Sequence, residues 1–273
     1  MASLNQGILS RLQVPYATEA EQRAIAAALS DADALLGGLD RLIAKKRDLK
    51  QAAMQQLLSG QIRLPGYHAK WDALPASEIG SFRGGNGFPL KEQGEASGTY
   101  PFFKVSDMNN EGNETFMIAS NHWISEQTRK RLGATAFPAD SIVFAKVGAA
   151  VFLERKRILR QPSCIDNNMA AFVLDKSFVD VRFIHTLLLN KKLSNLVATT
   201  ALPSINGKQL GEMILVIPPL PEQIAIAEVL SEMDAELAGL GQQREKTRAL
   251  KQGMMQELLT GRTRLISPEQ SYA

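Results

Sequence analysis

The sequence predicts an α+β protein in which a β-rich domain is attached to an antiparallel pair of long coiled-coil-like helices. Segment 21–64 returns without a gap as segment 222–265, with about 24 of roughly 44 aligned positions identical. Apolar residues in both copies recur at alternating steps of four and three, the pattern of a coiled-coil seam. The segment between the copies instead shows short β-like runs separated by turn signals.

Each copy carries the start and stop signals of one long helix. Thr18 and Glu21 match a capping box, and Pro221-Glu222 suits a first helical turn. Ser59-Gly60 and Thr260-Gly261 place a glycine where a helix commonly stops in the left-handed conformation. No proline interrupts either copy, so each helix is expected to run about 40 residues, or about 60 Å.

The predicted seam has an apolar part, a polar interruption and a second apolar part. The interruptions are 45–48 and 242–248, after which the seam is expected to resume at Leu49 and Leu250. An ordinary amphipathic helix packed on its own domain is the alternative, but a helix this long cannot lie wholly on one small domain. Because the middle segment joins the end of the first helix to the start of the second, the helices should be antiparallel, with the middle at one end.

Some apolar residues of the two helices are candidates for contact with the helices of a partner protein, with incidental surface as the alternative. These candidates are Leu35, Leu42, Leu57, Leu237, Met255 and Leu258.

The middle segment predicts an α+β domain with a β-rich core. Strands are expected at 101–105, 141–145, 149–153 and 169–174. A helix is expected at 181–198, where apolar residues mark one face.

Composition limits the class of protein. The net charge of +3 permits a nucleic-acid partner without arguing for one, and the single cysteine, Cys164, excludes an internal disulfide framework and fits a reducing cytosol. Neither a signal peptide nor a run of about 18 apolar residues is evident, so we expect a cytoplasmic protein that does not engage a membrane.

Known catalytic motifs are missing from the sequence. It contains no Gly-x-x-x-x-Gly-Lys-[Ser/Thr] phosphate loop, no Gly-x-Ser-x-Gly elbow and no Asn-Pro-Pro-Tyr motif. His68, His122 and His185 are scattered and lack metal-site spacing with Cys164. We therefore expect no catalytic residues and no metal site.

Basic clusters and polar loops in the middle segment suggest contact with nucleic acid. Arginine and lysine can bind phosphates, while asparagine and serine can read base edges. Solvated charge and simple turn chemistry are the alternatives. The candidates are Arg83, Asn86, Lys104, Ser106, Asn109, Asn110, Lys146, Arg155, Lys156, Arg157, Asn167, Asn168, Asn206 and Lys208.

Several motifs resemble one family across nearly the whole chain. Segment 217–223, Ile-Pro-Pro-Leu-Pro-Glu-Gln, leads into a long helix that closes with Leu-Leu-[Ser/Thr]-Gly. Within the middle, the motifs are Trp71 followed by the turn 84–88, Tyr-Pro-Phe-Phe-Lys-Val-Ser-Asp-Met at 100–108, the hairpin 137–148 and the closing stretch 201–206. Together they resemble the specificity subunit of type I restriction-modification systems.

This resemblance implies a non-catalytic subunit that recognises double-stranded DNA. It implies a target recognition domain on a DNA half-site and helices that bind modification (methyltransferase) subunits, with a restriction subunit in the same assembly. S-adenosylmethionine, ATP and Mg would belong to those partners, and no cofactor is expected in this chain. The alternative is a truncated or inactive coiled-coil adaptor without independent DNA recognition.

The resemblance also predicts how the chain is divided. Residues 15–64 and 218–265 are the conserved helical regions, 65–217 are the recognition domain, and 266–273 are a tail. Residues 1–14 resemble the end of a preceding recognition domain, because Ala2-Ser3-Leu4-Asn5 is similar to Pro203-Ser204-Ile205-Asn206. The chain thus resembles the C-terminal two-thirds of a specificity subunit, and the second reading domain could belong to another specificity chain or to a second copy.

Overall fold

The computed structural model describes residues 16–197 and 203–266. The chain divides into a helical unit, Met1–Ala53 with Leu230–Ala273, and a β-rich unit, Met54–Val229. Both divisions fall inside a long helix, so each long helix contributes residues to both units. The predicted α+β fold class is confirmed.

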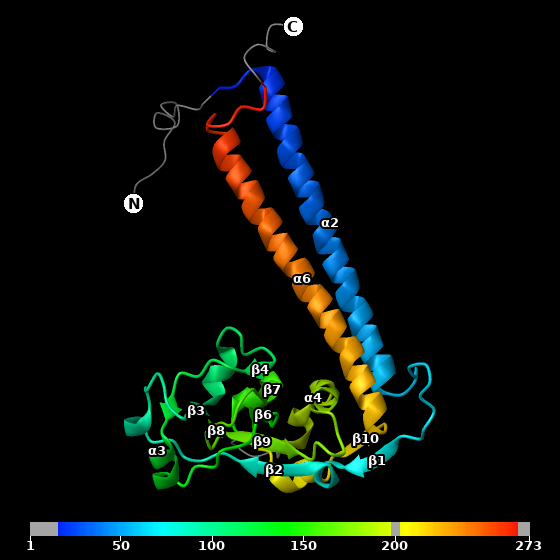
Figure 1. Cartoon of the computed structure of the whole chain (residues 1–273), viewed down its shortest axis with the longest axis vertical. Helices are drawn as coiled ribbons and strands as arrows, with labels where there is room; N and C mark the ends of the chain where they lie inside the picture. The colour runs from blue at the N-terminus through cyan, green and yellow to red at the C-terminus, as the bar shows by residue number, and fades with distance from the viewer. Residues whose placement is uncertain (1–15, 198–202, 267–273) are drawn as a thin grey trace. The chain divides into compact units, whose positions relative to one another are not determined.

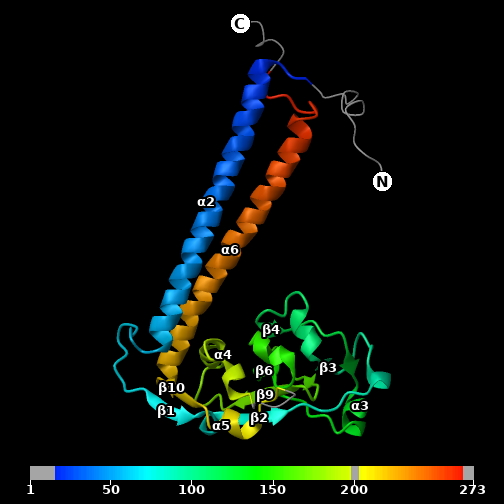
Figure 2. The same ribbon diagram turned by 180° about the vertical axis from the view of Figure 1, so that it is seen from behind.

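The repeat forms two helices of nearly equal length. Helix α2 spans Glu19–Leu58 (40 residues), and α6 spans Leu220–Leu258 (39 residues). They lie side by side in both ribbon views (Figures 1 and 2). Within the helical unit, residues further along α2 form ion pairs with residues nearer the start of α6, so the two helices are antiparallel. The pairs are Asp33–Lys251, Asp40–Arg244, Lys46–Glu236 and Lys50–Asp234.

The seam is continuous, which corrects the predicted interruption. Buried or half-buried side chains recur at steps of four and three along α6 from Ile226 to Leu258. Leu49 and Leu250 stand one position off the seam and are 48% and 64% exposed. Four seam positions hold basic side chains instead: Lys46, Lys50, Arg244 and Lys251. A long basic side chain suits such a position because its stem packs while its charged head reaches an acid on the opposite helix.

The helix ends follow most of the predicted signals. Thr18 Oγ1 accepts a hydrogen bond from the Glu21 backbone at 3.4 Å, which is one half of the capping box. The other half is absent, because the Glu21 carboxylate accepts hydrogen bonds from Arg264 Nε at 2.5 Å and from the Leu265 backbone at 3.2 Å. Gly60 and Gly261 adopt φ of 71° and 72°, which confirms the left-handed stops.

The described strands of the β-rich unit form sheets of two, five and three strands. Their orders are β1-β10, β2-β9-β6-β7-β4 and β5-β3-β8. The strands are β1 Asp72–Pro75, β2 Gly80–Gly84, β3 Tyr100–Phe103, β4 Phe116–Met117, β5 Trp123–Ile124, β6 Ile142–Ala145, β7 Lys156–Leu159, β8 Cys164–Ile165, β9 Met169–Leu174 and β10 Ile214–Ile217. β1 pairs antiparallel with β10, so the first and last strands of the unit are neighbours.

Short helices and 3-10 turns connect the strands. The α-helices are α3 Glu126–Arg131, α4 Val181–Leu189 and α5 Gly207–Gly211. The 3-10 turns are η1 Ala76–Glu78, η2 Leu90–Glu92, η3 Val105–Asn109, η4 Ala149–Leu153 and η5 Leu193–Leu196. Buried aromatic and aliphatic side chains from several strands form the core, among them Phe103, Met117, Val143 and Met169.

Two local predictions for this unit need correction. Segment 149–153 is the 3-10 turn η4 rather than a strand, because Gly148 and Glu154 on either side adopt φ of 77° and 53° and reverse the chain. Helix α4 ends at Leu189 rather than near 198, and residues 198–202 lie outside the described residues.

Candidate nucleic-acid interface

The structure brings two predicted segments together beside β7. Asn109, at the end of η3, accepts a side-chain hydrogen bond from Arg155. Arg157, inside β7, donates from Nε to the Asn113 carbonyl at 2.5 Å. Burial and the nearby charge of Arg155 lower the pKa of Arg157. We call Asn109, Arg155 and Arg157 the hairpin-edge cluster. Its two neighbouring guanidinium groups would be stabilised by a bound anion.

The loop that carries Asn109 is organised by two buried residues that the sequence analysis did not single out. Asp107 is fully buried, and its carboxylate accepts a hydrogen bond from the Lys104 backbone at 2.6 Å. Asn113 is also fully buried and donates to the carbonyls of Asp107 and Ala119 at 2.7 and 2.8 Å. Its side-chain oxygen Oδ1 also accepts hydrogen bonds from the backbones of Ile118 and Ala119. Such a satisfied network holds the exposed side chains of the loop in one arrangement.

A second group of predicted residues lines a hollow where β2 and β6 end. Arg83, Lys146 and Asn206, the sheet-end cluster, border this hollow of about 360 Å³. A Cβ at Gly84 would lie 2.6 Å from Lys146 Nζ, so glycine leaves room for that ammonium group. The Lys146 backbone donates to Asn168 O at 2.8 Å, which joins a further candidate loop to this edge.

Three predicted contact residues have hydrogen-bond partners within the protein. Lys156 is fully buried and donates from Nζ to Glu154 at 2.5 Å and to the Lys191 carbonyl at 2.8 Å, so it cannot reach a phosphate as predicted. Asn86 joins two loops through Gly133 O and the Thr135 backbone. Asn206 caps α5 by accepting from the Gln209 backbone at 2.8 Å.

The remaining candidates differ in exposure. Lys104 is half-buried and donates to Gln93 at 2.9 Å, and Asn110 is half-buried beside Ala119 and Asn121. The basic run at 129–131 is largely neutralised, since Arg129 pairs with Glu126 and Arg131 with Glu92. The exposed candidates are Arg83, Ser106, Asn109, Asn167, Asn168, Asn206 and Lys208.

A charge pair between the buried Lys156 and the half-buried Glu154 fixes the chain next to the hairpin-edge cluster. The Glu154 carboxylate accepts from Lys156 Nζ and from the Leu193 and Ser194 backbones at 3.0 and 2.8 Å. Partial burial raises the pKa of Glu154, but these hydrogen bonds outweigh it and hold the pKa at about 2. His185, whose pKa is lowered by burial, interacts through Nε2 with the Lys156 carbonyl at 3.0 Å. These contacts tie β7 to α4 and η5.

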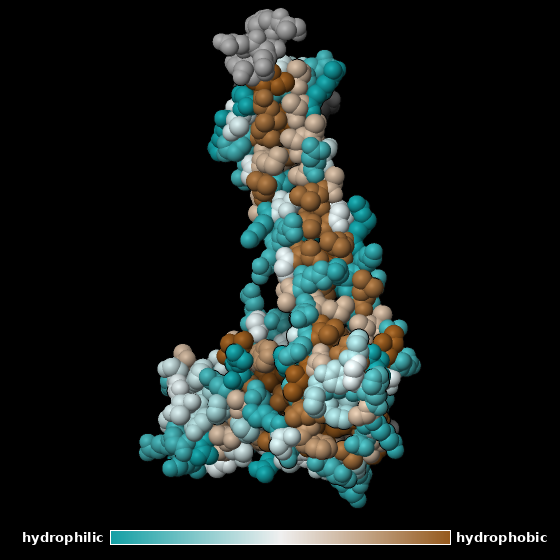
Figure 3. Space-filling model, turned by 45° about the vertical axis from the view of Figure 1, so that its right-hand side comes forward, coloured by the Kyte–Doolittle hydropathy of each residue, from teal (hydrophilic) through white to brown (hydrophobic). Residues whose placement is uncertain are grey.

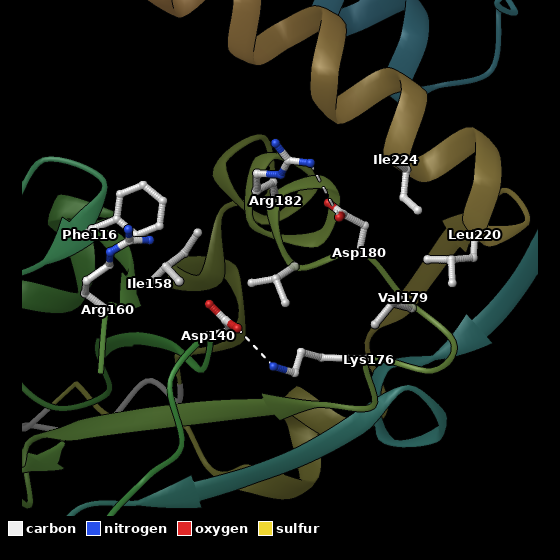
Figure 4. A pocket seen from close by; sticks show the side chains of 11 residues that line it. Phe116, Asp140, Ile158, Arg160, Lys176, Val179, Asp180, Arg182, Leu220 and Ile224 are labelled. Atoms are coloured by element: carbon white, nitrogen blue, oxygen red, sulfur yellow. Dashed lines mark hydrogen bonds and ion pairs between the residues drawn. The ribbon is translucent and has the colours of Figure 1, made fainter. Parts of the chain in front are cut away.

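Arg160 lies on a different part of the surface from Arg155, although both belong to one basic run. It follows the C-terminal end of β7, where its guanidinium stacks 5.5 Å from the Phe116 ring centroid. Figure 4 shows it at the side of a hollow of about 340 Å³ with Asp140, Lys176 and Arg182. Lys176 pairs with Asp140 at 2.9 Å, so part of the positive charge of this hollow is already neutralised.

The helix candidates for partner contact separate into two groups. Leu35, Leu42 and Met255 are 51%, 39% and 41% exposed, and Figure 3 shows apolar surface along the helix pair. Leu237 is half-buried at a seam position. Leu57 and Leu258 are each only 6% exposed. They occupy seam positions, so the predicted partner contact is wrong for these two side chains.

Within the described ranges, no helix carries an apolar stretch sufficient to cross a membrane. The same ranges contain no group of histidine, cysteine and carboxylate side chains arranged to hold a metal ion.

Comparison with known proteins identifies the family. Residues 69–247 match the family described as type I restriction modification DNA specificity domain, and the chain belongs to this family. The MjaVIII type I restriction enzyme specificity subunit of Methanocaldococcus jannaschii is 22% identical over 279 residues, which cover 96% of this chain and 64% of that protein.

Solved structures share the fold. The HsdS subunit from Thermoanaerobacter tengcongensis superimposes with a TM-score of 0.57 at 18% identity, covering 95% of this chain and 63% of that one. The type I restriction-modification S subunit from M. genitalium superimposes with a TM-score of 0.57 at 17% identity, covering 94% and 65%. The chain therefore spans less than two thirds of the length of these relatives.

Proposed function

We propose that this chain is a non-catalytic, DNA-reading specificity subunit of a type I restriction-modification complex. It reads a DNA half-site with the β-rich unit and docks modification and restriction subunits. Methyl transfer, translocation and cleavage, with S-adenosylmethionine, ATP and Mg, belong to those partners. Family membership supports this proposal, and the observation that carries it is the hairpin-edge cluster, where two arginines and an exposed asparagine meet beside one strand.

The chemistry of the two clusters suits double-stranded DNA. Arginine binds phosphate through paired donors and also reads guanine, while asparagine can pair with adenine. The described residues around Arg155 and Lys146 form no ion pair with either side chain, so both charges are available to phosphates. The sheet-end cluster would then fix the position of the domain on the backbone, and the exposed amides would read bases.

The salt dependence of DNA binding tests this proposal. Each phosphate contact contributes about −0.9 to the slope of log affinity against log salt concentration. Arg155→Ala should make that slope shallower by about one, measured by fluorescence anisotropy with a 30-base-pair duplex. Arg160→Ala is the matched control from the same basic run and should leave the slope unchanged. Equal slopes for all three proteins would refute the assigned interface.

The repeat supports a second proposal, about what covers the helix pair. In the β-rich unit, Gln223 is 1% exposed and bonds to Asp180 N and Pro218 O, while Leu58 is 7% exposed. Their repeat equivalents in the helical unit are the exposed Gln22 and Leu259, the latter 50% exposed. These residues border a hollow of about 520 Å³. We propose that this hollow receives a second recognition domain, which buries the second copy as the first is buried.

The methylation pattern of cells that carry this chain with its modification subunit distinguishes the sources of that domain. A symmetric bipartite motif would indicate a second copy of this chain, and an asymmetric bipartite motif would indicate a different recognition domain. The absence of any motif would favour the alternative, a coiled-coil adaptor without DNA recognition. The exposed Leu35, Leu42 and Met255 are the proposed contacts for modification subunits.

A further inference from the structure

Two large apolar side chains project from the hairpin between β6 and β7. In η4, Val151 turns inward and is 3% exposed, whereas Phe152 and Leu153 are 55% and 57% exposed. Burying apolar side chains of this size stabilises a protein or a complex. Folding leaves more than half of the surface of both side chains in contact with water. We call Phe152 and Leu153 the apolar tip.

The apolar tip is rigidly supported from both sides. Before it, the Gly148 backbone donates to the Pro203 carbonyl at 2.8 Å. After it, Glu154 adopts a left-handed conformation, and its carboxylate accepts from Lys156, Leu193 and Ser194. A projection held in this way loses little conformational entropy on binding. The Glu154–Lys156 pair is therefore an anchor for the tip.

The surroundings of the tip are positively charged. Arg155 lies two residues after Leu153, Arg157 lies two residues further along in β7, and Lys191 and Lys192 adjoin the η5 turn that binds Glu154. In the described residues, none of the four forms an ion pair within 4 Å. The Glu154 charge is compensated by Lys156. An apolar tip surrounded by free cations complements a groove between phosphate strands, where the thymine methyl group is the apolar feature.

We propose that the apolar tip enters a groove of the target duplex and reads a thymine methyl group, while the adjacent cations hold the flanking phosphates. This inference rests on the proposed DNA-reading function and assigns a specificity element within it. Phe152 and Leu153 would then supply sequence preference, whereas Arg155 would supply binding that does not depend on sequence.

Selection from a randomised 30-base-pair duplex pool tests the proposal with the full chain. Wild-type protein should enrich a motif that contains at least one T·A pair. The double variant Phe152→Ala/Leu153→Ala should lose about tenfold of the preference at that pair and keep the rest of the motif. Phe178→Ala is the matched control, because Phe178 is 46% exposed, comparable to Phe152, but lies outside the tip and both clusters. It should leave the motif unchanged.

Uracil provides the chemical control. Replacing the selected thymine by uracil removes only the methyl group, so wild-type binding should fall about tenfold while binding of the double variant stays the same. An unchanged motif in the double variant, or no response of the wild type to uracil, would overturn the assignment. The assignment would also be overturned if the double variant kept its DNA motif but lost binding to the modification subunit. If the wild-type chain neither enriches a motif nor binds duplex DNA, the proposed function itself fails.

Discussion

Gln223 and Gln22 occupy equivalent positions in the repeat but have different surroundings, so the same substitution should have unequal effects. Gln223 is 1% exposed, accepts from the Asp180 backbone at 3.0 Å and donates to the Pro218 carbonyl at 2.8 Å. Gln22 is exposed, and in the described part of the chain its side-chain amide donates to the Ala17 carbonyl at 2.7 Å. Replacing each glutamine by alanine makes the same substitution at a buried position and at an exposed position of the repeat.

The expected difference follows from the groups left unpaired. Gln223→Ala leaves the Asp180 N–H and the buried Pro218 carbonyl without their partner, and each such group costs about 1–3 kcal/mol. We therefore expect the free energy of unfolding to fall by about 3 kcal/mol. An exposed substitution such as Gln22→Ala should change it by no more than about 0.5 kcal/mol.

Urea denaturation measures both effects. The two tryptophans, Trp71 and Trp123, lie in the β-rich unit and report on its unfolding, while circular dichroism at about 222 nm follows the helices. With a slope of about 2 kcal/mol per molar urea, Gln223→Ala should lower the midpoint by about 1.5 M. Midpoints that shift equally for the two variants would refute the argument that burial separates the two copies.

Two further predictions concern the anchor and the helix pair. Hydrogen bonds hold the pKa of Glu154 at about 2, below the usual value of 4.5 for a glutamate. The stability that this carboxylate contributes, about 2–3 kcal/mol, is therefore present above pH 4.5 and lost as the pH falls toward 2. The melting temperature of Glu154→Gln should therefore fall less between pH 4.5 and pH 2 than that of the wild type. Parallel curves of melting temperature against pH for the variant and the wild type would contradict this prediction. Inserting seven residues after Leu42 and seven after Gln243 keeps the seam register and lengthens each helix by about 10 Å, so the gap between methylated half-sites should grow by about 3 base pairs. An unchanged gap would exclude the helices as a spacer, and a four-residue insertion, which shifts the seam, is the control.

The helices were predictable because their signals are local and occur twice. Each signal involves only a few neighbouring residues: the glycine at the helix end, the hydroxyl cap at its start, and the apolar residues at steps of four and three. The structure confirms helices of the expected length. The seam was misread where Lys46 and Lys50 occupy it, because counting apolar residues overlooks the packing of long basic stems. Ion pairs with the opposite helix determine whether a basic side chain can occupy a seam position, and the acidic partners lie far away in the sequence.

The candidate interface was only partly predictable, because its geometry depends on distant contacts. Asn109 and Arg155 are 46 residues apart, and nothing in either segment indicates that they meet. Lys156 and Arg157 are adjacent basic residues with opposite environments, since strand alternation sends one into the core toward Glu154 and leaves the other half-buried. A run of charges in a sequence therefore does not specify a patch until the strand that carries it is known.

The unequal burial of the repeat explains why a duplicated helix can serve two different contacts. Leu58 and Leu259 are equivalent leucines at the ends of equivalent helices, yet they are 7% and 50% exposed. Local sequence cannot account for this difference, because the same local signals surround both. The difference arises from the β-rich unit, which covers one copy with its own residues. The exposed copy keeps the glutamine and leucine that, in the other copy, pack within the β-rich unit. If a second domain covers the exposed copy as we propose, Gln22→Ala should become costly only when that domain is bound.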